Sequence, residues 1–367
     1  MQRGTHRLHH RKPRRASAET RSQATESRAA PRHLAGEADL NAVIRAVVRK
    51  GEVEHGDTFV GFRDGWKGLT ENLTRPLNVE HCRGILPQGG TILGTSRTNP
   101  YKIEGGVEAV RETLKKNDID VLVAIGGDDT LGVAHKLSQE GVQVIGVPKT
   151  IDNDLSATDV TFGFHTAVQI ATDAIDRLHT TAESHDRVLV CEVMGRHAGW
   201  IAMYAGMAGG AAEILIPEEP FDIDEVAAKI KERHSKGRYA SVVVVAEGAL
   251  PKEGSLAVSS GKVDAFGHAQ LGGIGQVVAD ALEERTGYEM RVTVLGYIQR
   301  GGTPTAYDRV LATRFGLRAI GAVHEKAFGK MVALKGDVID LVPLGEAVAE
   351  LKTVGPDFLD EAAVFFG

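Results

Sequence analysis

Residues 121–154, VLVAIGGDDTLGVAHKLSQEGVQVIGVPKTIDND, decide the fold. Two apolar runs, Val121–Ile125 and Val142–Val147, are typical of buried β-strands, and each is followed by a loop rich in Gly, Asp, Lys or Thr. Between them, Leu131–Gln139 predicts a short helix with its leucines on one face. This order places polar side chains at the carboxyl ends of two strands, where open α/β sheets bind ligands.

The rest of the chain repeats this alternation of strand and helix. Further apolar runs at Arg187–Val193, Val242–Ala246 and Arg291–Leu295 alternate with the helical patterns Phe164–Thr181, Ile223–Ser235 and Gly273–Thr286, each of which precedes one of the runs. Continuous apolar runs indicate parallel strands covered on both faces. With 367 residues, the chain is long enough for two cores. We predict an α/β protein with two doubly wound, mostly parallel sheet domains and an active site in the cleft between them.

The amino-terminal stretch does not look folded. Residues 1–33 are rich in Arg and Ser, have almost no large apolar residues and show no periodicity, which predicts disorder. We expect a solvated extension or an upstream start codon rather than an organelle transit peptide. Folded sequence is expected near Leu40, in a helix with Asp39 as its N-cap. Residues 251–270, rich in Gly and Ser, predict an exposed loop.

Composition excludes several classes of protein. The net charge of -6, with the basic residues concentrated at the amino terminus, argues against nucleic acid as a partner. No apolar run approaches the ~18 residues of a membrane span. Two cysteines are too few for a disulfide framework. We therefore expect a cytoplasmic protein without a nucleic-acid or membrane partner.

Four carboxylates follow the two central strands. Taken separately, GGDD and TIDND are ordinary turn sequences, because Asp and Gly are the commonest turn residues. Together, Asp128, Asp129, Asp152 and Asp154 would repel one another unless a cation lay among them. The adjacent glycines allow backbone N–H groups to approach a phosphate. This combination predicts a site for Mg²⁺ and a polyphosphate.

The chain resembles the 6-phosphofructokinase family of bacterial type, which has ATP-using and pyrophosphate-using branches. The resemblance runs from about Leu40 to about Val342 and rests on VAIGGDDT, VPKTIDND, EVMGRHAGW, VAEG and VLGYIQRGGTPTAYDR. It implies phosphorylation of fructose 6-phosphate at its 1-hydroxyl, a glycolytic step, by a homodimer or homotetramer with shared active sites. The implied domains are residues 37–163 with 299–349 for the donor and Mg²⁺, and residues 164–298 with 350–367 for the sugar; residues 1–36 stand apart as a disordered or anomalous extension.

The family's catalytic roles fall on matching positions of the central stretch. Asp152 would be the base that accepts the hydroxyl proton, assisted by Asp154, and Thr150 would donate to the transferring phosphoryl group or the sugar hydroxyl. Asp128 would contact Mg²⁺ through water. The resemblance places the donor against Gly126, Gly127, Asp129, Thr130, Lys149 and Arg97.

The sugar phosphate would be held mainly by arginine, whose guanidinium fork matches phosphate oxygens. The resemblance assigns substrate binding to Thr150, Asp152, Met194, Gly195, Arg196, Glu247, Tyr297 and Arg300, with Arg187 and Arg291 reaching in from an adjacent subunit. Arg196 would also serve catalysis. A single arginine at a strand end is more often a solvated surface charge, but four within matching motifs favour phosphate binding. Tyr297 stands where the ATP branch usually has His, and His197 and Trp200 are expected to support the loop.

Two positions bear on the donor. ATP-using members usually have Gly at the positions of Asp129 and Lys149. A carboxylate at 129 would crowd and repel a nucleotide phosphate, whereas Lys149 supplies a charge that pyrophosphate can use. Pyrophosphate is therefore the predicted donor, with ATP as the alternative.

The amino terminus departs from the family pattern. Members begin with an apolar strand and a Gly-Gly-Gly-Asp-x-Pro-Gly-Leu-Asn loop, but no strand is visible between Arg21 and His33, and only Gly36 remains of the glycines. The alternatives are an altered amino terminus, a wrong reading frame or start, or a catalytically silent subunit that binds sugar phosphate. A NAD or lipid kinase, which shares the GGD-type loop, does not explain MGRHAGW or QRGGTP.

Overall fold

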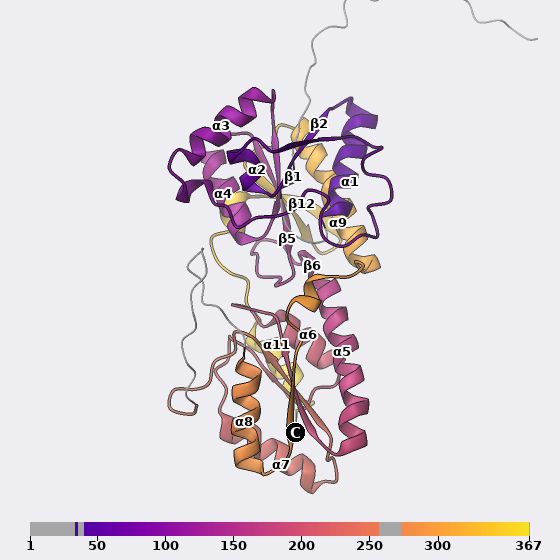
Figure 1. Cartoon of the computed structure of the whole chain (residues 1–367), viewed down its shortest axis with the longest axis vertical. Coiled ribbons are helices and arrows are strands. Elements are labelled where there is room, and N and C mark those ends of the chain that lie inside the picture. Colours follow the sequence, from indigo (N-terminus) through magenta and orange to yellow (C-terminus); the bar gives the residue numbers. More distant parts are fainter. Residues whose placement is uncertain (1–33, 36–39, 257–272, 367) are drawn as a thin grey trace, which may run out of the picture.

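The computed structural model describes residues 34–35, 40–256 and 273–366. Two β-sheets lie in two lobes stacked along the long axis of the molecule (Figure 1). Nearly all strand pairs within them are parallel, and helices lie on both faces of each sheet. The predicted α/β class with two doubly wound sheets is confirmed.

The first sheet has the strand order β1-β4-β5-β11-β12, and β6 pairs with β5 beyond this path. All of these pairs are parallel except β11 with β12. A separate antiparallel pair, β2 with β3, lies in the same lobe (Figure 1). The strands are β1 (Leu34–Ala35), β2 (Phe59–Phe62), β3 (Thr74–Leu77), β4 (Leu122–Gly126), β5 (Val144–Thr150), β6 (Phe162–Gly163), β11 (Lys330–Lys335) and β12 (Val338–Pro343).

The second sheet has the order β10-β7-β9-β8, with every pair parallel. Its carboxyl edge therefore gathers the ends of all four strands, as the first sheet's carboxyl edge gathers those of β4 and β5. The strands are β7 (Val188–Val193), β8 (Glu213–Leu215), β9 (Ser241–Ala246) and β10 (Met290–Val294).

Buried apolar side chains cover each sheet on both faces. On the first sheet, α1 and α9 contribute Val43 and Phe315 to one face, and α3 and α4 contribute Val110 and Leu131 to the other. The helices of this lobe are α1 (Asn41–Lys50), continued by the π-helical η1 (Gly51–His55), α2 (Trp66–Thr70), the 3-10 helix η2 (Pro100–Lys102), α3 (Gly106–Lys116), α4 (Asp128–Gln139), α9 (Ala306–His324) and α10 (Leu344–Ala347).

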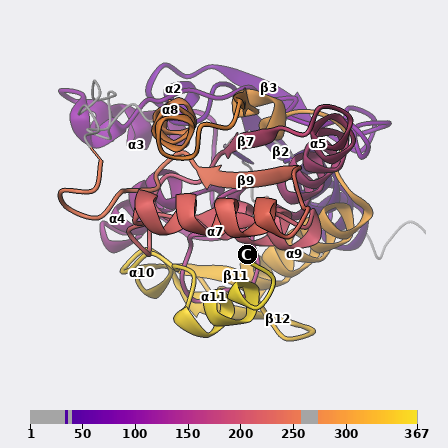
Figure 2. The ribbon, with the colours of Figure 1, turned by 90° about the horizontal axis from the view of Figure 1, so that it is seen from below.

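On the second sheet, α5 and α6 cover one face and α7 and α8 the other. Figure 2 shows α7 running alongside β9. Near the end of the chain, Val354 and Ala362 pack into the α5–α6 side of this core. The helices are α5 (Phe164–His185), α6 (Trp200–Ala208), α7 (Ile223–Ser235), α8 (Ile274–Thr286), the 3-10 helix η3 (Gly296–Arg300) and α11 (Pro356–Ala363).

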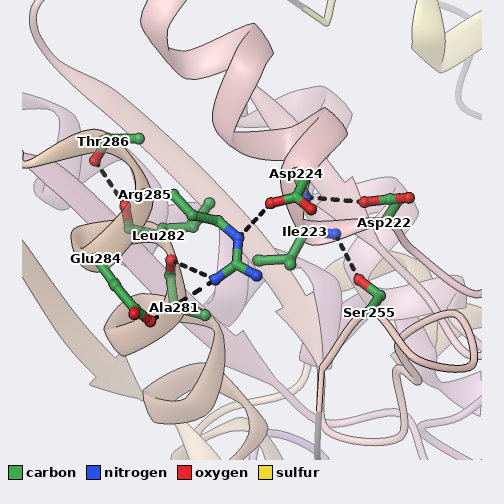
Figure 3. Close-up of polar contacts among 9 residues, drawn as sticks. All are labelled: Asp222, Ile223, Asp224, Ser255, Ala281, Leu282, Glu284, Arg285 and Thr286. Carbon is green, nitrogen blue, oxygen red and sulfur yellow. Dashed lines mark hydrogen bonds and ion pairs between the residues drawn. The ribbon is translucent and has the colours of Figure 1, made fainter.

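Polar contacts join α7 to α8, the two helices that cover one face of the second sheet (Figure 3). Asp222 is the N-cap of α7, and its Oδ1 accepts from the Asp224 amide at 2.9 Å. The Asp224 carboxylate in turn accepts from the Arg285 guanidinium of α8. Ser255 accepts from the Ile223 amide at 3.1 Å, so the loop after β9 is joined to the same corner. Asp224, in the first turn of α7, thus links α7 to α8.

Two element boundaries differ from the prediction, and both bear on the site. Helix α4 begins at Asp128 rather than Leu131, so Asp128 and Asp129 lie in its first helical turn and not in a loop. Strand β5 continues to Thr150, which places Lys149 inside the sheet. The helix dipole favours a carboxylate in the first turn of a helix. A prediction based on the spacing of apolar residues does not detect such a polar first turn.

The start of the first lobe also differs. Leu34–Ala35 forms β1, which pairs with Val123 and Ala124 of β4, so a short strand not visible in the sequence takes this place in the sheet. The N-cap of α1 is Leu40, which makes no side-chain cap, rather than Asp39. Residues 1–33, 36–39 and 257–272 lie outside the described residues, and with them the predicted extension, the altered glycine loop and most of the predicted exposed loop.

Both cysteines are free and buried. Burial raises the pKa of the Cys191 thiol to about 12, so Cys191 behaves as a small apolar core residue. Across the described part of the chain, no helix combines the length and apolarity needed to cross a membrane.

Candidate active site

The turn between β4 and α4, residues 126–130, is called the donor turn below. Gly126 is needed there for packing, because a Cβ on it would lie 2.5 Å from the Cβ of Thr130. Gly127 is the N-cap of α4 and has an extended backbone. Asp128 and Asp129 follow, and both are exposed. The turn therefore presents two carboxylates beside the amide groups of a helix N-terminus, a combination that suits an anion only with a bridging cation.

Residues 150–154, from the last residue of β5 onward, are called the base loop below. The Asp152 amide donates to Thr150 Oγ1 at 3.1 Å, and the Thr150 hydroxyl donates to the Asp154 carboxylate. Asn153 has a φ of +53°, a left-handed conformation that Asn tolerates better than most residues. Its Oδ1 accepts from the Thr161 amide at 3.0 Å. Side-chain hydrogen bonds thus fix a loop whose backbone reverses sharply.

The two carboxylates of the base loop are desolvated. One oxygen of each, Oδ1 of Asp152 and of Asp154, is buried without a hydrogen-bond partner. Burial raises the pKa of both carboxyls, and the neighbouring charge of Asp152 helps to raise the pKa of Asp154 to about 7. Positive side chains act against this rise in the pKa of Asp152: Arg300, Lys149 and Arg196. A buried, partly neutralised carboxylate with an unused oxygen is suited to accept a proton.

The carboxyl ends of β7 and β9 bring a second group of predicted residues to the base loop. Gly195 has a φ of +135°, and a Cβ there would lie 2.7 Å from the Ala198 carbonyl oxygen, so only glycine fits. The Gly248 amide donates to the Gly195 carbonyl at 3.2 Å, which joins the MGRHAGW loop to the end of β9. Burial and then the charge of Asp152 raise the pKa of Glu247, so Glu247 faces the same space as the base loop.

The QRGGTP stretch joins these strand ends. Gln299 is 1% exposed, and its Oε1 accepts from the Met194 amide at 3.3 Å. Arg300, beside it, acts electrostatically on both Asp152 and Glu247. Tyr297, on the same 3-10 helix, is exposed. Gln299 stands in the QRGGTP motif, but no role for it was predicted from the sequence. The structure shows a buried side-chain amide that holds the Met194 backbone.

Not all predicted residues meet in one chain. Arg187 precedes β7 and Arg291 lies at the start of β10, so both sit at the amino edge of the second sheet. Both guanidinium groups contact Glu289, and Arg187 Nε lies 2.9 Å from its Oε2. The six residues of β7 separate Arg187 from Met194 by about 20 Å. Arg97 lies exposed in the loop before η2.

Sequence reasoning overlooked Lys352, in the segment between α10 and α11. Its Nζ donates to Asn153 Oδ1 at 2.9 Å, and its amide donates to the Asp154 carbonyl at 2.8 Å. The segment carries no family motif and no periodicity, so no sequence signal connects it to the base loop.

The described residues supply only part of a coordination shell for Mg²⁺. Within residues 34–35, 40–256 and 273–366, no group of three or more His, Cys, Asp or Glu side chains could hold a metal ion by itself. The negative charge of Asp128 helps to raise the pKa of Asp154, so carboxylates of the donor turn and the base loop lie near each other. Mg²⁺ typically takes one or two carboxylates and completes its shell with water and substrate phosphates. These residues fit an ion of that kind.

Known proteins resemble the chain over nearly its whole length. The phosphofructokinase family profile matches residues 35–323. The pyrophosphate–fructose 6-phosphate 1-phosphotransferase of Amycolatopsis methanolica is 62% identical over 328 residues, 89% of this chain and 96% of that protein. ATP-dependent 6-phosphofructokinase 3 of Streptomyces coelicolor is 55% identical over 318 residues, 87% of this chain and 93% of that protein. The crystal structure of the pyrophosphate-dependent phosphofructokinase of Nitrosospira multiformis superposes with a TM-score of 0.78 at 23% identity, covers 92% of each chain and bears on the fold alone. The chain belongs to the phosphofructokinase family.

Proposed function

We propose that the protein phosphorylates fructose 6-phosphate at its 1-hydroxyl with pyrophosphate as donor, giving fructose 1,6-bisphosphate and orthophosphate. The observation that carries the proposal is Asp152, a desolvated carboxylate with an unused oxygen beside three cationic side chains. Such a group is suited to remove a hydroxyl proton while phosphate charge is neutralised around it. The two relatives are named for this reaction with pyrophosphate and for the ATP-dependent enzyme.

The reaction moves one phosphoryl group and one proton. The sugar's O1 attacks the terminal phosphorus, the bond from that phosphorus to the bridging oxygen breaks, and the hydroxyl proton passes to Asp152. Thr150 orients Asp154 and donates toward the transferring group. Asp128, with help from Asp154, would hold Mg²⁺, which would supply positive charge to neutralise the donor. Arg196 and Arg97 stabilise the charge that spreads over the phosphoryl oxygens.

The sugar lies against the second lobe in this proposal. Glu247 accepts from its hydroxyls, and Met194 and Gly195 line the ring. Tyr297 and Arg300 bind the 6-phosphate. We assign the donor to residues 37–163 with 299–349, the sugar to residues 164–298 with 350–367, and the enzyme to the cytoplasm.

Arg187 and Arg291 lie at the wrong edge of the second sheet to serve this chain's own site. We therefore propose that they complete the site of a neighbouring subunit in a homodimer or homotetramer. Mixing Arg291→Ala and Asp152→Asn subunits tests this: a shared site restores roughly a quarter of the wild-type activity, since some sites receive both wild-type residues. Activity no higher than that of either parent would contradict the sharing.

Pyrophosphate is favoured over ATP by two charges, Lys149 of β5 and Asp129 of the donor turn. Lys149 is 3% exposed, and its positive charge opposes the rise in the pKa of Asp152, so this charge lies within the site. Asp129, exposed in the first turn of α4, adds a carboxylate that would crowd and repel a nucleotide phosphate. Gly126, Gly127 and Thr130 complete the proposed cradle.

A donor comparison tests the function and its donor together. Wild type, Asp129→Gly and the matched control Asp357→Gly, an exposed Asp in the first turn of α11, are assayed with pyrophosphate and with ATP. We expect Asp129→Gly alone to lose pyrophosphate use and gain ATP use by about tenfold each. An unchanged ratio would contradict the role of Asp129. No product from wild type with either donor, together with calorimetric binding of fructose 6-phosphate, would favour a silent sugar-phosphate-binding subunit.

A further inference from the structure

Residues 351–354, between α10 and α11, cross from the base loop to the MGRHAGW loop. The Lys352 amide donates to the Asp154 carbonyl at 2.8 Å, and the Lys352 carbonyl accepts from Trp200 Nε1 at 2.9 Å. Two residues on, the Val354 amide donates to Glu218 Oε1 at 2.9 Å, and the same carboxylate accepts from the Gly199 amide. One short segment therefore fixes both loops of the proposed site.

The Lys352 side chain is fully used within this arrangement. Its Nζ donates to Asn153 Oδ1 at 2.9 Å, to the Thr158 carbonyl at 3.1 Å and to the Asp159 carbonyl at 2.8 Å. An ammonium group has three hydrogens, so each has an acceptor. The same Nζ lies 5.6 Å from the centre of the Trp200 ring, within the range of a cation–π contact.

Asn153 links this ammonium group to the base. It lies between Asp152 and Asp154 in a left-handed conformation, and its Oδ1 accepts hydrogen bonds from Lys352 Nζ and from the Thr161 amide. Thr161 is itself fully buried and donates its hydroxyl to the Thr150 carbonyl at 2.8 Å. Without Lys352, Asn153 Oδ1 would lose its only donor from outside Thr161 among the described residues, and the carbonyl oxygens of Thr158 and Asp159 would lose the ammonium group as donor, so the reversal at Asn153 would loosen.

We propose that Lys352 is a positioning residue of the phosphoryl-transfer site, which holds the base loop through Asn153 and fixes it against Trp200. This rests on the proposed function, in which Asp152 is the base. Lys352 does not touch the substrates. Its effect on the rate comes from the orientation of Asp152, and a displacement of about 1 Å in a catalytic group can cost about 10²-fold.

The test compares Lys352→Met, Lys352→Arg and the control Lys236→Met, in which an exposed lysine paired with Glu232 is removed. For Lys352→Met we expect kcat to fall about 10- to 100-fold while the KM for fructose 6-phosphate changes less than threefold. Hydrogen exchange at the Thr161 amide should become faster, because its acceptor is no longer held. Lys352→Arg, whose guanidinium still donates hydrogen bonds, should retain more of kcat than Lys352→Met. Lys236→Met should match wild type.

Several outcomes would overturn the inference. Unchanged kcat in Lys352→Met, with unchanged exchange at Thr161, would show that the loop holds itself. If Lys352→Met does not fold, Lys352→Gln decides, since its amide has two hydrogens for the three acceptors: unchanged kcat with unchanged exchange at Thr161 would exclude a positioning role. Inactive wild type with both donors would contradict the proposed function instead, while Thr161 exchange would still report whether Lys352 holds the loop.

Discussion

The donor turn and the base loop follow neighbouring parallel strands, and each carries two aspartates, but the structure places them in opposite surroundings. Gly126 of β4 is in register with Pro148 of β5, so both segments open at the same edge of the first sheet. Asp128 and Asp129 are exposed on the first turn of α4. Asp152 and Asp154 each have a buried oxygen without a partner.

This difference shows how four similar residues divide between two tasks. An exposed carboxylate stays hydrated and charged, which suits an ion that keeps much of its water. A desolvated carboxylate has a raised pKa and a stronger tendency to take up a proton, which suits a base. Burial, rather than residue type, assigns the roles that we propose.

The largest expected effect follows from replacing the proposed base. Asp152→Asn should lower kcat by about 10²- to 10⁴-fold, because no carboxylate accepts the hydroxyl proton. Binding of fructose 6-phosphate, measured by calorimetry, should change only a few-fold. Thermal unfolding should not occur at lower temperature, since a costly buried carboxyl has been removed. Retention of most activity would show that the base lies elsewhere.

The next effect concerns stability and pH. Since the pKa of Asp154 is raised from 3.8 to about 7, the folded protein binds this proton more tightly than the unfolded chain. The group is protonated in both states below about pH 4, and its cost to stability grows as the pH rises to about 7. Asp154→Asn should therefore be more stable than wild type, and the difference in the free energy of unfolding should grow by about 2 kcal/mol from pH 5 to pH 8. Urea unfolding in the presence of EDTA measures this difference in stability. A difference that does not change with pH would show that the Asp154 carboxylate is hydrated rather than desolvated.

A smaller effect tests the packing of the donor turn. In Gly126→Ala the new Cβ would lie 2.5 Å from Thr130 Cβ, so we expect a loss of about 1–3 kcal/mol in the free energy of unfolding. Gly127→Ala is the matched control, because its nearest neighbour would be the Lys149 carbonyl at 3.4 Å. Adding Thr130→Gly should recover part of the loss in Gly126→Ala. Equal stability of the two alanine variants would contradict a packing role for Gly126.

The smallest expected effect is at an exposed carboxylate. Asp128→Asn should raise the Mg²⁺ concentration for half-maximal activity about tenfold, or about 1.4 kcal/mol, while kcat at saturating Mg²⁺ changes less than about twofold. Its urea midpoint should match that of wild type, since Asp128 is exposed. Asp357→Asn serves as the control. An unchanged Mg²⁺ titration would remove Asp128 from the proposed metal site.

Much of the fold could be read from the sequence because parallel strands and their covering helices carry strong apolar patterns. The helix Ile223–Ser235 was predicted with the bounds that the structure gives, and the other main elements were shifted by a few residues. The larger errors fell where polar residues extend an element, as at Asp128 in α4 and Lys149 in β5. Helix dipoles and ladder hydrogen bonds, which hydrophobicity does not register, decide such ends. Strand β1, with two residues, is too short to leave a pattern.

The sequence by itself determined the α/β class, the family and the residue types available at the two strand ends, because these depend on local patterns and on motifs in a fixed order. Only the tertiary structure decided which carboxylates are desolvated, since burial comes from segments distant in the chain. It also separated Arg187 and Arg291 from the arginines at the carboxyl edge, because strand direction, not motif, sets the edge. And it brought Lys352 to Asn153, 199 residues away, by a contact that no local pattern encodes.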